Sequence, residues 1–284
     1  QLVKTENKWT TIPNLPGAPG MNIRSINDKG QAVGNTTTDE DSTNRPHAFL
    51  WSNGKVKDLG ALLGKRFESA AVDINNKGQV LGYYYDGNGY RIFLWQNGKF
   101  IKLGTAGNRY DIILPIAINN AGQIIGEIWK GDDHYFFIWE KGKMKKMAGF
   151  SDMGKTSYMV GDLNDKGQIV GFFSSYDREV DKITTGSFLW ENGVLRDLGI
   201  EGAMVTGINN RGDIVGSQYK MGWGYHGFIW RDEEVISINE FLSDDEIAKH
   251  GFEEYLKIND QRQILGKGVV FNLTDEMLSS AKKK

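Results

Sequence analysis

Cysteine is absent from the 284 residues, which excludes disulfide scaffolds, cysteine-ligated zinc, iron–sulfur clusters and thiol catalysis. Long apolar runs are missing too. The longest, Ile112 to Ile118, is interrupted by Pro115 and is far shorter than the roughly 18 residues of a membrane-spanning helix, so we expect no membrane insertion. The net charge is only −2, and without a basic excess nucleic acid is not an expected partner.

Proline is scarce, with 5 residues, whereas glycine contributes 36. Flexible low-complexity segments are rich in both residues, so the glycine of this chain must serve an ordered structure. An internal repeat explains it. The segment Ile26-Asn-Asp-Lys-Gly-Gln-Ala-Val-Gly34 returns with small changes from positions 74, 118, 163, 208 and 258.

Each repeat predicts four short strands. A small apolar strand precedes the Ile-Asn pair, the Asn and Gly form a tight turn, and a second strand follows. A third strand is rich in aromatics and ends in Trp in five units, as in His47-Ala-Phe-Leu-Trp51, and an alternating fourth strand follows an Asn-Gly turn in three of them. Four antiparallel strands in roughly 45 residues are typical of one propeller blade. We therefore predict an all-β fold, a single six-bladed β-propeller of four-stranded antiparallel blades.

The chain ends suggest how the propeller closes. The last unit stops after its third strand, Val269 to Leu273, whereas Trp9 to Leu15 resembles an isolated fourth strand. We expect residues 9–15 to complete the C-terminal blade. The predicted propeller thus spans residues 1–273, and residues 274–284 form a short C-terminal tail.

The motif set resembles the HAF-type extracellular repeat family. The first unit carries it nearly complete, with His47-Ala-Phe-Leu-Trp51 and Asp58-Leu-Gly60. Departures are local: Arg262 replaces the turn glycine of the last unit, Asp213 replaces Gln, and Asp232-Glu233 replaces Asn-Gly. The resemblance implies an exported bacterial protein, located outside the cell or in its envelope, whose signal peptide is absent from this sequence. It implies no catalytic residues.

Several patterns have a simpler structural explanation. Residues 149–156 match a phosphate loop and residues 222–227 a dinucleotide motif, but no strand-to-helix unit surrounds either one, so we expect no cofactor. His47 and His226 occupy the same position in non-neighbouring blades, which argues against a metal site. Turn formation accounts for the repeated asparagines and packing between blades for the repeated tryptophans.

Binding residues are expected in the variable loops between second and third strands, because loops on a rigid scaffold commonly carry function. These loops are rich in aromatics, which suit a sugar or a protein partner. We therefore predict a monomeric binding module for carbohydrate or a protein. The candidate ligand-binding residues are Tyr84, Tyr85, Tyr90, Trp129, Tyr135, Trp223, Tyr225 and Arg109.

An enzymatic function is the alternative. Polar side chains precede the repeated Ile or Leu on the inner strands, and two carboxylates with two bases can support acid–base chemistry. The weak catalytic candidates of such a hydrolase or lyase are Asp73, Asp162, Lys257 and Arg24.

Overall fold

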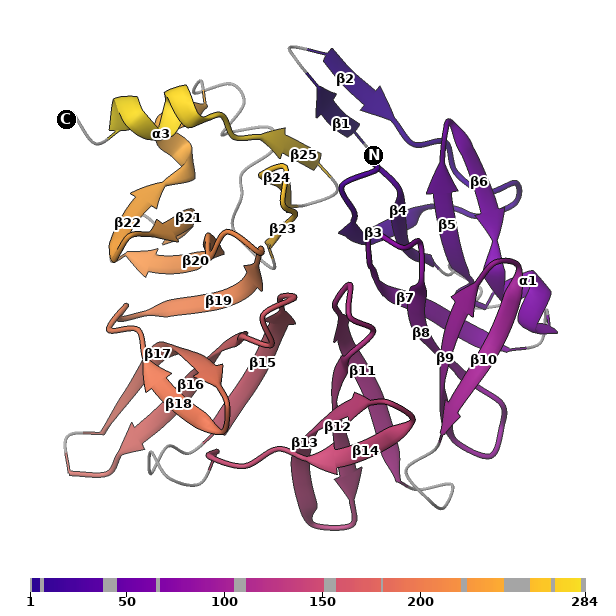
Figure 1. Ribbon diagram of the computed structural model, residues 1–284, viewed down its shortest axis with the longest axis horizontal. Helices are drawn as coiled ribbons and strands as arrows, with labels where there is room; N and C mark the ends of the chain where they lie inside the picture. The colour runs from indigo at the N-terminus through magenta and orange to yellow at the C-terminus, as the bar shows by residue number, and fades with distance from the viewer. Residues whose placement is uncertain are drawn as a thin grey trace. The chain divides into compact units, whose positions relative to one another are not determined.

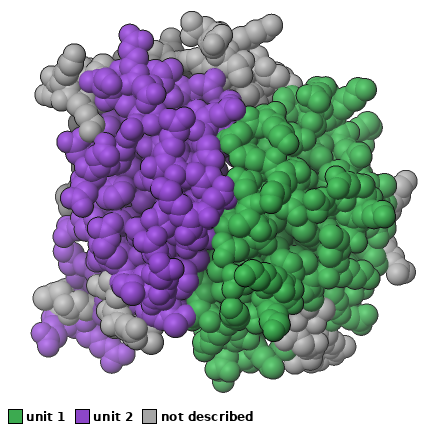
Figure 2. Space-filling model, in the orientation of Figure 1, with its two compact units in different colours: residues 1–3, 9–147 green, residues 4–8, 148–284 purple. Residues whose placement is uncertain are grey.

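The protein is described from a computed structural model (Figure 1). The structure describes residues 2–5, 8–37, 45–64, 67–104, 111–150, 157–179, 181–220, 224–242, 256–266 and 269–281. The chain divides into two compact units, residues 1–3 with 9–147 and residues 4–8 with 148–284 (Figure 2). No helix in the described part of the chain has the length and apolarity to cross a membrane.

The first unit contains three four-stranded antiparallel sheets, each with its strands in chain order. Blade 1 consists of β3 (Met21–Ile26), β4 (Ala32–Thr36), β5 (Ala48–Ser52) and β6 (Lys55–Asp58), followed by helix α1 (Leu59–Gly64). Blade 2 consists of β7 (Glu68–Ile74), β8 (Val80–Tyr85), β9 (Tyr90–Gln96) and β10 (Lys99–Gly104). Blade 3 consists of β11 (Ile112–Ile118), β12 (Ile124–Lys130), β13 (Asp133–Glu140) and β14 (Lys143–Lys146).

The second unit repeats this arrangement in two further sheets. Blade 4 consists of β15 (Ser157–Leu163), β16 (Ile169–Asp177), β17 (Lys182–Glu191) and β18 (Val194–Asp197). Blade 5 consists of β19 (Ala203–Ile208), β20 (Ile214–Lys220), β21 (Gly224–Arg231) and β22 (Glu234–Ser237), followed by the 3₁₀ helix η1 (Ile238–Phe241).

Blade 6 takes its outer strands from the N-terminus. Its sheet order is β23 (Lys257–Ile258), β24 (Gln263–Gly266), β25 (Val269–Asn272), β1 (Leu2–Thr5) and β2 (Lys8–Thr11). The predicted strand Trp9 to Leu15 contributes residues 9–11 to β2, and Leu2–Thr5, which carries no repeat motif, lies next to β25. Helix α3 (Asp275–Ala281) follows β25 along the chain. The predicted all-β propeller with six blades is confirmed.

The repeated asparagines form the predicted turns. In blade 1, Oδ1 of Asn27 accepts the backbone N–H groups of Lys29 and Gln31 at 3.1 and 3.0 Å. Gly30 closes the turn with a positive φ of 69°, which glycine adopts without steric cost. Oδ1 of Asn75, Asn164, Asn209 and Asn259 accepts the same two amides of its own turn.

The same asparagines also join successive blades. Nδ2 of Asn27 donates to the carbonyl of Asn75 at 3.0 Å, and Nδ2 of Asn75 donates to the carbonyl of Asn119 at 2.9 Å. In the second unit Asn164 and Asn209 donate to the next asparagine carbonyl at 3.2 Å each. One side chain therefore shapes its own turn and fixes the neighbouring turn, which keeps the inner ends of the blades in register.

The cores lie between neighbouring blades. One cluster combines Val33 and Leu50 of blade 1 with Phe93 and Trp95 of blade 2, and a second joins blades 2 and 3, with Trp139 packed against it. A third joins blades 4 and 5, with Trp230 packed against it. These clusters confirm for three of the repeated tryptophans that the ring packs between blades.

Candidate functional site

The inner-strand carboxylate of Asp73 is fully engaged in structural contacts. Its Oδ1 accepts the Ser25 hydroxyl at 2.5 Å and the backbone N–H of Ile74 at 2.8 Å, and its Oδ2 accepts the backbone N–H of Ile118 at 2.7 Å. Asp73 is buried. These donors come from blades 1, 2 and 3, so the carboxylate holds three inner strands together.

Asp162 repeats this arrangement in the second unit. It accepts the backbone N–H groups of Leu163 at 2.9 Å and Ile208 at 3.4 Å. The Lys257 ammonium lies 3.3 Å from its Oδ2 and donates to the carbonyl of Gly161 at 2.8 Å. A carboxylate and an ammonium held by backbone partners join blades 4, 5 and 6. Since the carboxylate and the ammonium already bind each other and the backbone, this arrangement gives no support to acid–base catalysis.

Arg24, the remaining catalytic candidate, is exposed on β3. Its Nε donates to Oδ1 of Asn35 at 3.4 Å. Its charge also lies near Tyr83. Burial raises the pKa of the Tyr83 hydroxyl, and Arg24 partly opposes this rise. Within the described residues no group of three or more His, Asp or Glu side chains is placed to hold a metal ion.

The loop aromatics are organised by strand register. The residue three places after the repeated second-strand glycine faces a residue of the third strand, and in three blades both partners have aromatic rings. We call these three cross-strand pairs the aromatic pairs; they are Tyr85–Tyr90 in blade 2, Trp129–His134 in blade 3 and Tyr219–Tyr225 in blade 5. Blade 4 has Ser174 and Thr185 at this register.

Blade 3 carries the most closely stacked aromatic pair. The rings of Trp129 and His134 lie 3.8 Å apart between centroids and 18° from parallel. Nε2 of His134 lies 3.1 Å from Oε2 of Glu127, which orients the imidazole. The rings of His134 and Phe136 also meet edge to face, with their centroids 5.1 Å apart. Trp129 remains 44% exposed, so the hairpin presents a braced indole with a carboxylate beside it.

In blade 2 the aromatic pair is half-buried. The Tyr85 and Tyr90 rings lie 5.4 Å apart, and Tyr83 approaches Tyr90 at 5.7 Å. The adjoining loop is held by an ion pair between Nε of Arg91 and Oδ2 of Asp86 at 3.1 Å. Tyr90 also packs against the core between blades 2 and 3, so only part of this pair can meet a ligand.

The pair of blade 5 is the most exposed. The rings of Tyr219 and Tyr225 meet edge to face at 5.4 Å, and the two residues are 53% and 41% exposed. Two further predicted ligand-binding residues, Trp223 and Arg109, lie outside the described residues.

Of two further predicted site residues, Tyr84 is buried and Tyr135 is half-buried. Tyr84 is 5% exposed and packs against Phe93 and Phe67, with ring centroids 6.5 and 5.6 Å away. Tyr135 is half-buried against the core of blades 2 and 3, with the Lys146 ammonium 4.9 Å from its ring. Side chains alternate between the two faces of a strand, which is why Tyr84 and Tyr135 pack inward while their neighbours Tyr85 and His134 do not.

His134 and Tyr219 were not among the predicted ligand-binding residues. The sequence does hold a signal for Tyr219, because counting three places from the repeated glycine selects it together with Tyr85 and Trp129. The third-strand partners are not fixed by that count, since the hairpins differ in length.

No protein-family model matches the chain. No curated protein sequence matches it either. Solved structures do resemble it. TolB from Acinetobacter baumannii superposes with a TM-score of 0.56 at 12% identity over 89% of this chain, and this chain spans 63% of the TolB chain.

The β-propeller domain of the Trilobed protease from Pyrococcus furiosus superposes with a TM-score of 0.53 at 14% identity, covering 89% of this chain and 80% of that one. The shared feature is the propeller. At these identities the likeness shows the fold alone, and the HAF-type resemblance stays an expectation from the motifs.

Proposed function

We propose that this chain is a binding module for neutral carbohydrate, with the aromatic pairs as its binding surface. The observation that carries the proposal is their repetition at one strand register in blades 2, 3 and 5. A residue needed only for packing is buried, whereas Trp129, Tyr219 and Tyr225 are each at least 41% exposed. Exposed rings with fixed orientation offer contact area at little cost in conformational entropy.

Polar groups beside the rings suit sugar hydroxyls. The carboxylate of Glu127 accepts hydrogen bonds, and the Asp86–Arg91 pair places an acceptor and donors next to Tyr85 and Tyr90. Binding sites for small ligands combine aromatic walls with a few such polar groups. Blades 2 and 3 of the first unit each present an aromatic pair, so a repeating glycan can engage both of these blades and gain affinity through multivalency.

The test is glycan-array binding of the intact chain, followed by calorimetry with a glycan that binds. Trp129→Ala and the double variant Tyr219→Ala/Tyr225→Ala should each weaken binding about tenfold or more, as truncation of an aromatic anchor does. Ser174→Ala at the same register of blade 4 is the matched control and should leave affinity unchanged.

A glycan that binds with equal affinity to Trp129→Ala, to the Tyr219→Ala/Tyr225→Ala variant and to the control would overturn the assignment. If no glycan binds while a protein partner is lost in the same variants, the binding surface is right and the ligand class is wrong. We further propose export to the bacterial envelope or medium, as the HAF-type resemblance implies. Detection of the full-length product only inside the cell after fractionation would contradict this location.

A further inference from the structure

A second candidate site lies at the opposite end of blades 1 and 2 from the aromatic pairs. The Asn-initiated turns and the hairpins between third and fourth strands enclose a hollow of about 620 Å³ there. This volume falls within the range of roughly 300–1,000 Å³ of small-molecule sites. Its lining residues come from both blades, so the propeller scaffold, rather than one mobile loop, sets its shape.

Among the residues that the structure describes, four lysines and no acidic residue line this hollow. Lys29 and Lys77 come from equivalent turns of the two blades, and Lys55 and Lys57 from β6. All four are exposed, and none forms an ion pair with a carboxylate of the described residues. Uncompensated like charges gathered around one concavity repel each other and attract an anion.

In blade 3 the lysine equivalent to Lys57 has an acidic partner. There Glu140 occupies the position that Ser52 has in blade 1, and its Oε1 accepts the Lys145 ammonium at 2.8 Å. This hydrogen bond lowers the pKa of the Glu140 carboxyl. Gln123 donates to Glu140 at 3.2 Å, just as Gln31 donates to the Ser52 hydroxyl at 3.2 Å. Blade 1 therefore keeps the lysine and the glutamine but lacks the carboxylate.

The other residues that line the hollow limit the shape of the ligand. Leu50, Val56 and Trp95 supply apolar surface, and the Lys57 ammonium lies 5.1 Å from the centre of the Trp95 ring. Ser52, Gln31 and Asn97 supply neutral hydrogen-bonding groups. A bare inorganic ion would leave this apolar surface and most of the volume unused, whereas a ring carrying several acidic groups would use both.

We propose that this hollow binds a small polyanion built on a ring, such as a sulfated, phosphorylated or carboxylated saccharide. The four ammonium groups contact its acidic groups, and its ring lies against the half-buried Val56 and the small part of Trp95 that remains accessible. This site is independent of the aromatic pairs, because it is built from other residues at the other end of the blades.

The experiment is calorimetry on the intact chain at two salt concentrations. Sucrose octasulfate, inositol hexakisphosphate and trigalacturonate identify the preferred acidic group, and sucrose and myo-inositol are the uncharged counterparts. We expect at least one polyanion to bind, with an affinity that falls as salt rises, and neither neutral compound to bind at this site.

Two variants test the location. Ser52→Glu brings the carboxylate of blade 3 into blade 1 and should weaken binding about tenfold, since it both neutralises lysines and repels the anion. Lys57→Gln/Lys77→Gln should weaken binding similarly and leaves the hydrogen bond between Gln31 and Ser52 intact. Lys143→Gln, in blade 3 at the position of Lys55, is the control and should bind as the unmodified chain does.

Absence of binding by all three polyanions would overturn the proposal. So would equal losses in Lys57→Gln/Lys77→Gln and in Lys143→Gln, because the attraction would then belong to the general surface charge. Trp129→Ala should leave polyanion affinity unchanged, so failure of this site and failure of the aromatic pairs are separate results.

Discussion

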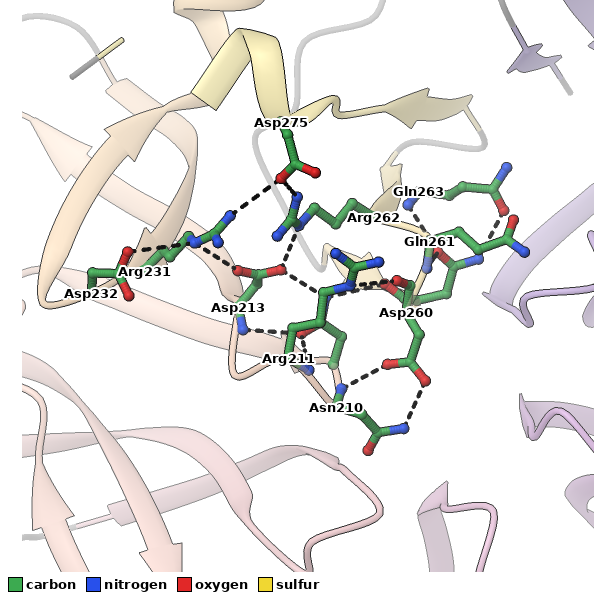
Figure 3. A network of polar contacts seen from close by, with 12 residues as sticks. Asn210, Arg211, Asp213, Arg231, Asp232, Asp260, Gln261, Arg262, Gln263 and Asp275 are labelled. Carbon is green, nitrogen blue, oxygen red and sulfur yellow. Dashed lines mark hydrogen bonds and ion pairs between the residues drawn. The ribbon is translucent and has the colours of Figure 1, made fainter. Parts of the chain in front are cut away.

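Nε of Arg262 donates to Oδ2 of Asp213 across 2.9 Å, and the two side chains are only 5% and 1% exposed (Figure 3). Each residue is a departure from the repeat. Arg262 stands where the other turns have glycine and keeps the positive φ of 56° that the turn requires. Asp213 stands where the other turns have Gln and still accepts Nδ2 of Asn209 at 3.0 Å. The buried charge of Asp213 is therefore balanced by the buried charge of Arg262.

Arg262→Ala should destabilise the chain by about 3–5 kcal/mol, since it leaves the buried Asp213 without its closest cationic partner. The double variant Asp213→Gln/Arg262→Gly restores the repeat and should recover most of that loss. Glycine removes the left-handed strain, and Gln restores an uncharged acceptor for Asn209. Denaturant unfolding of these variants, and of Asp213→Gln and Arg262→Gly alone, checks this; strictly additive single effects would show that the two residues are not coupled.

Asp275 of α3 makes a pH-dependent contact with the same arginine. The hydrogen bond from Arg262 lowers the pKa of the Asp275 carboxyl below its ordinary 3.8. A lowered pKa means that the contact stabilises the fold above pH 3.8 and is lost as the pH falls through the lower, folded value. Carboxyl NMR should show Asp275 titrating below the exposed aspartates. Asp275→Asn should increase amide exchange in α3 at neutral pH.

The turns were predictable from the sequence because their hydrogen bonds are local. Oδ1 of Asn27 accepts the backbone N–H groups of the residues two and four places ahead, so the nine-residue motif contains nearly all the contacts that form the turn. Asp73 and Ile118, which donates its backbone N–H to the Asp73 carboxylate, lie 45 residues apart in different blades, and only the folded arrangement brings them together. The strand Leu2–Thr5 was missed because nothing in its four residues repeats elsewhere.

The aromatic pairs were predicted in part, because the sequence shows which residues are aromatic but not to which face of its strand each side chain points. Tyr84 and Tyr85 are adjacent and chemically identical, yet Tyr84 is in the core and Tyr85 belongs to an aromatic pair. A one-residue change of register exchanges the two faces of a strand. The lysine-lined hollow was not predicted from the sequence. Its residues come from two blades, and its unpaired charge arises because blade 1 has Ser52 where blade 3 has the carboxylate of Glu140.

Asp73→Asn separates the structural role of the inner carboxylates from a catalytic one. The amide is uncharged and keeps a single acceptor oxygen, so all three donors lose a charged partner and at least one of them loses its acceptor at a buried site. We expect a loss of about 1–3 kcal/mol in stability and unchanged ligand affinity, read from denaturant unfolding and calorimetry. Turnover of a glycoside that disappears in a fully stable Asp73→Asn variant would instead favour the hydrolase or lyase.

The first hairpins of blades 1 to 5 each carry two repeated glycines, and substitution of the two should destabilise the chain for different reasons. In blade 3, a Cβ on Gly126 would lie 2.4 Å from the carbonyl oxygen of Leu114 and 2.5 Å from Cζ of the buried Phe137, its cross-strand partner, whereas a Cβ on Gly122 would meet nothing within 4 Å. Gly122 instead has a φ of 81°. Gly126→Ala should therefore cost about 1–3 kcal/mol through overpacking, and Gly122→Ala about 1–2 kcal/mol through backbone strain.

Asparagine distinguishes the two causes, because it tolerates the left-handed conformation but is larger than alanine. Gly122→Asn should be more stable than Gly122→Ala, while Gly126→Asn should be less stable than Gly126→Ala. Thermal unfolding of the four variants measures both differences. The opposite order at position 126 would mean that backbone conformation, not the space beside Phe137, selects glycine there. The abundance of glycine would then have one cause where the structure assigns two.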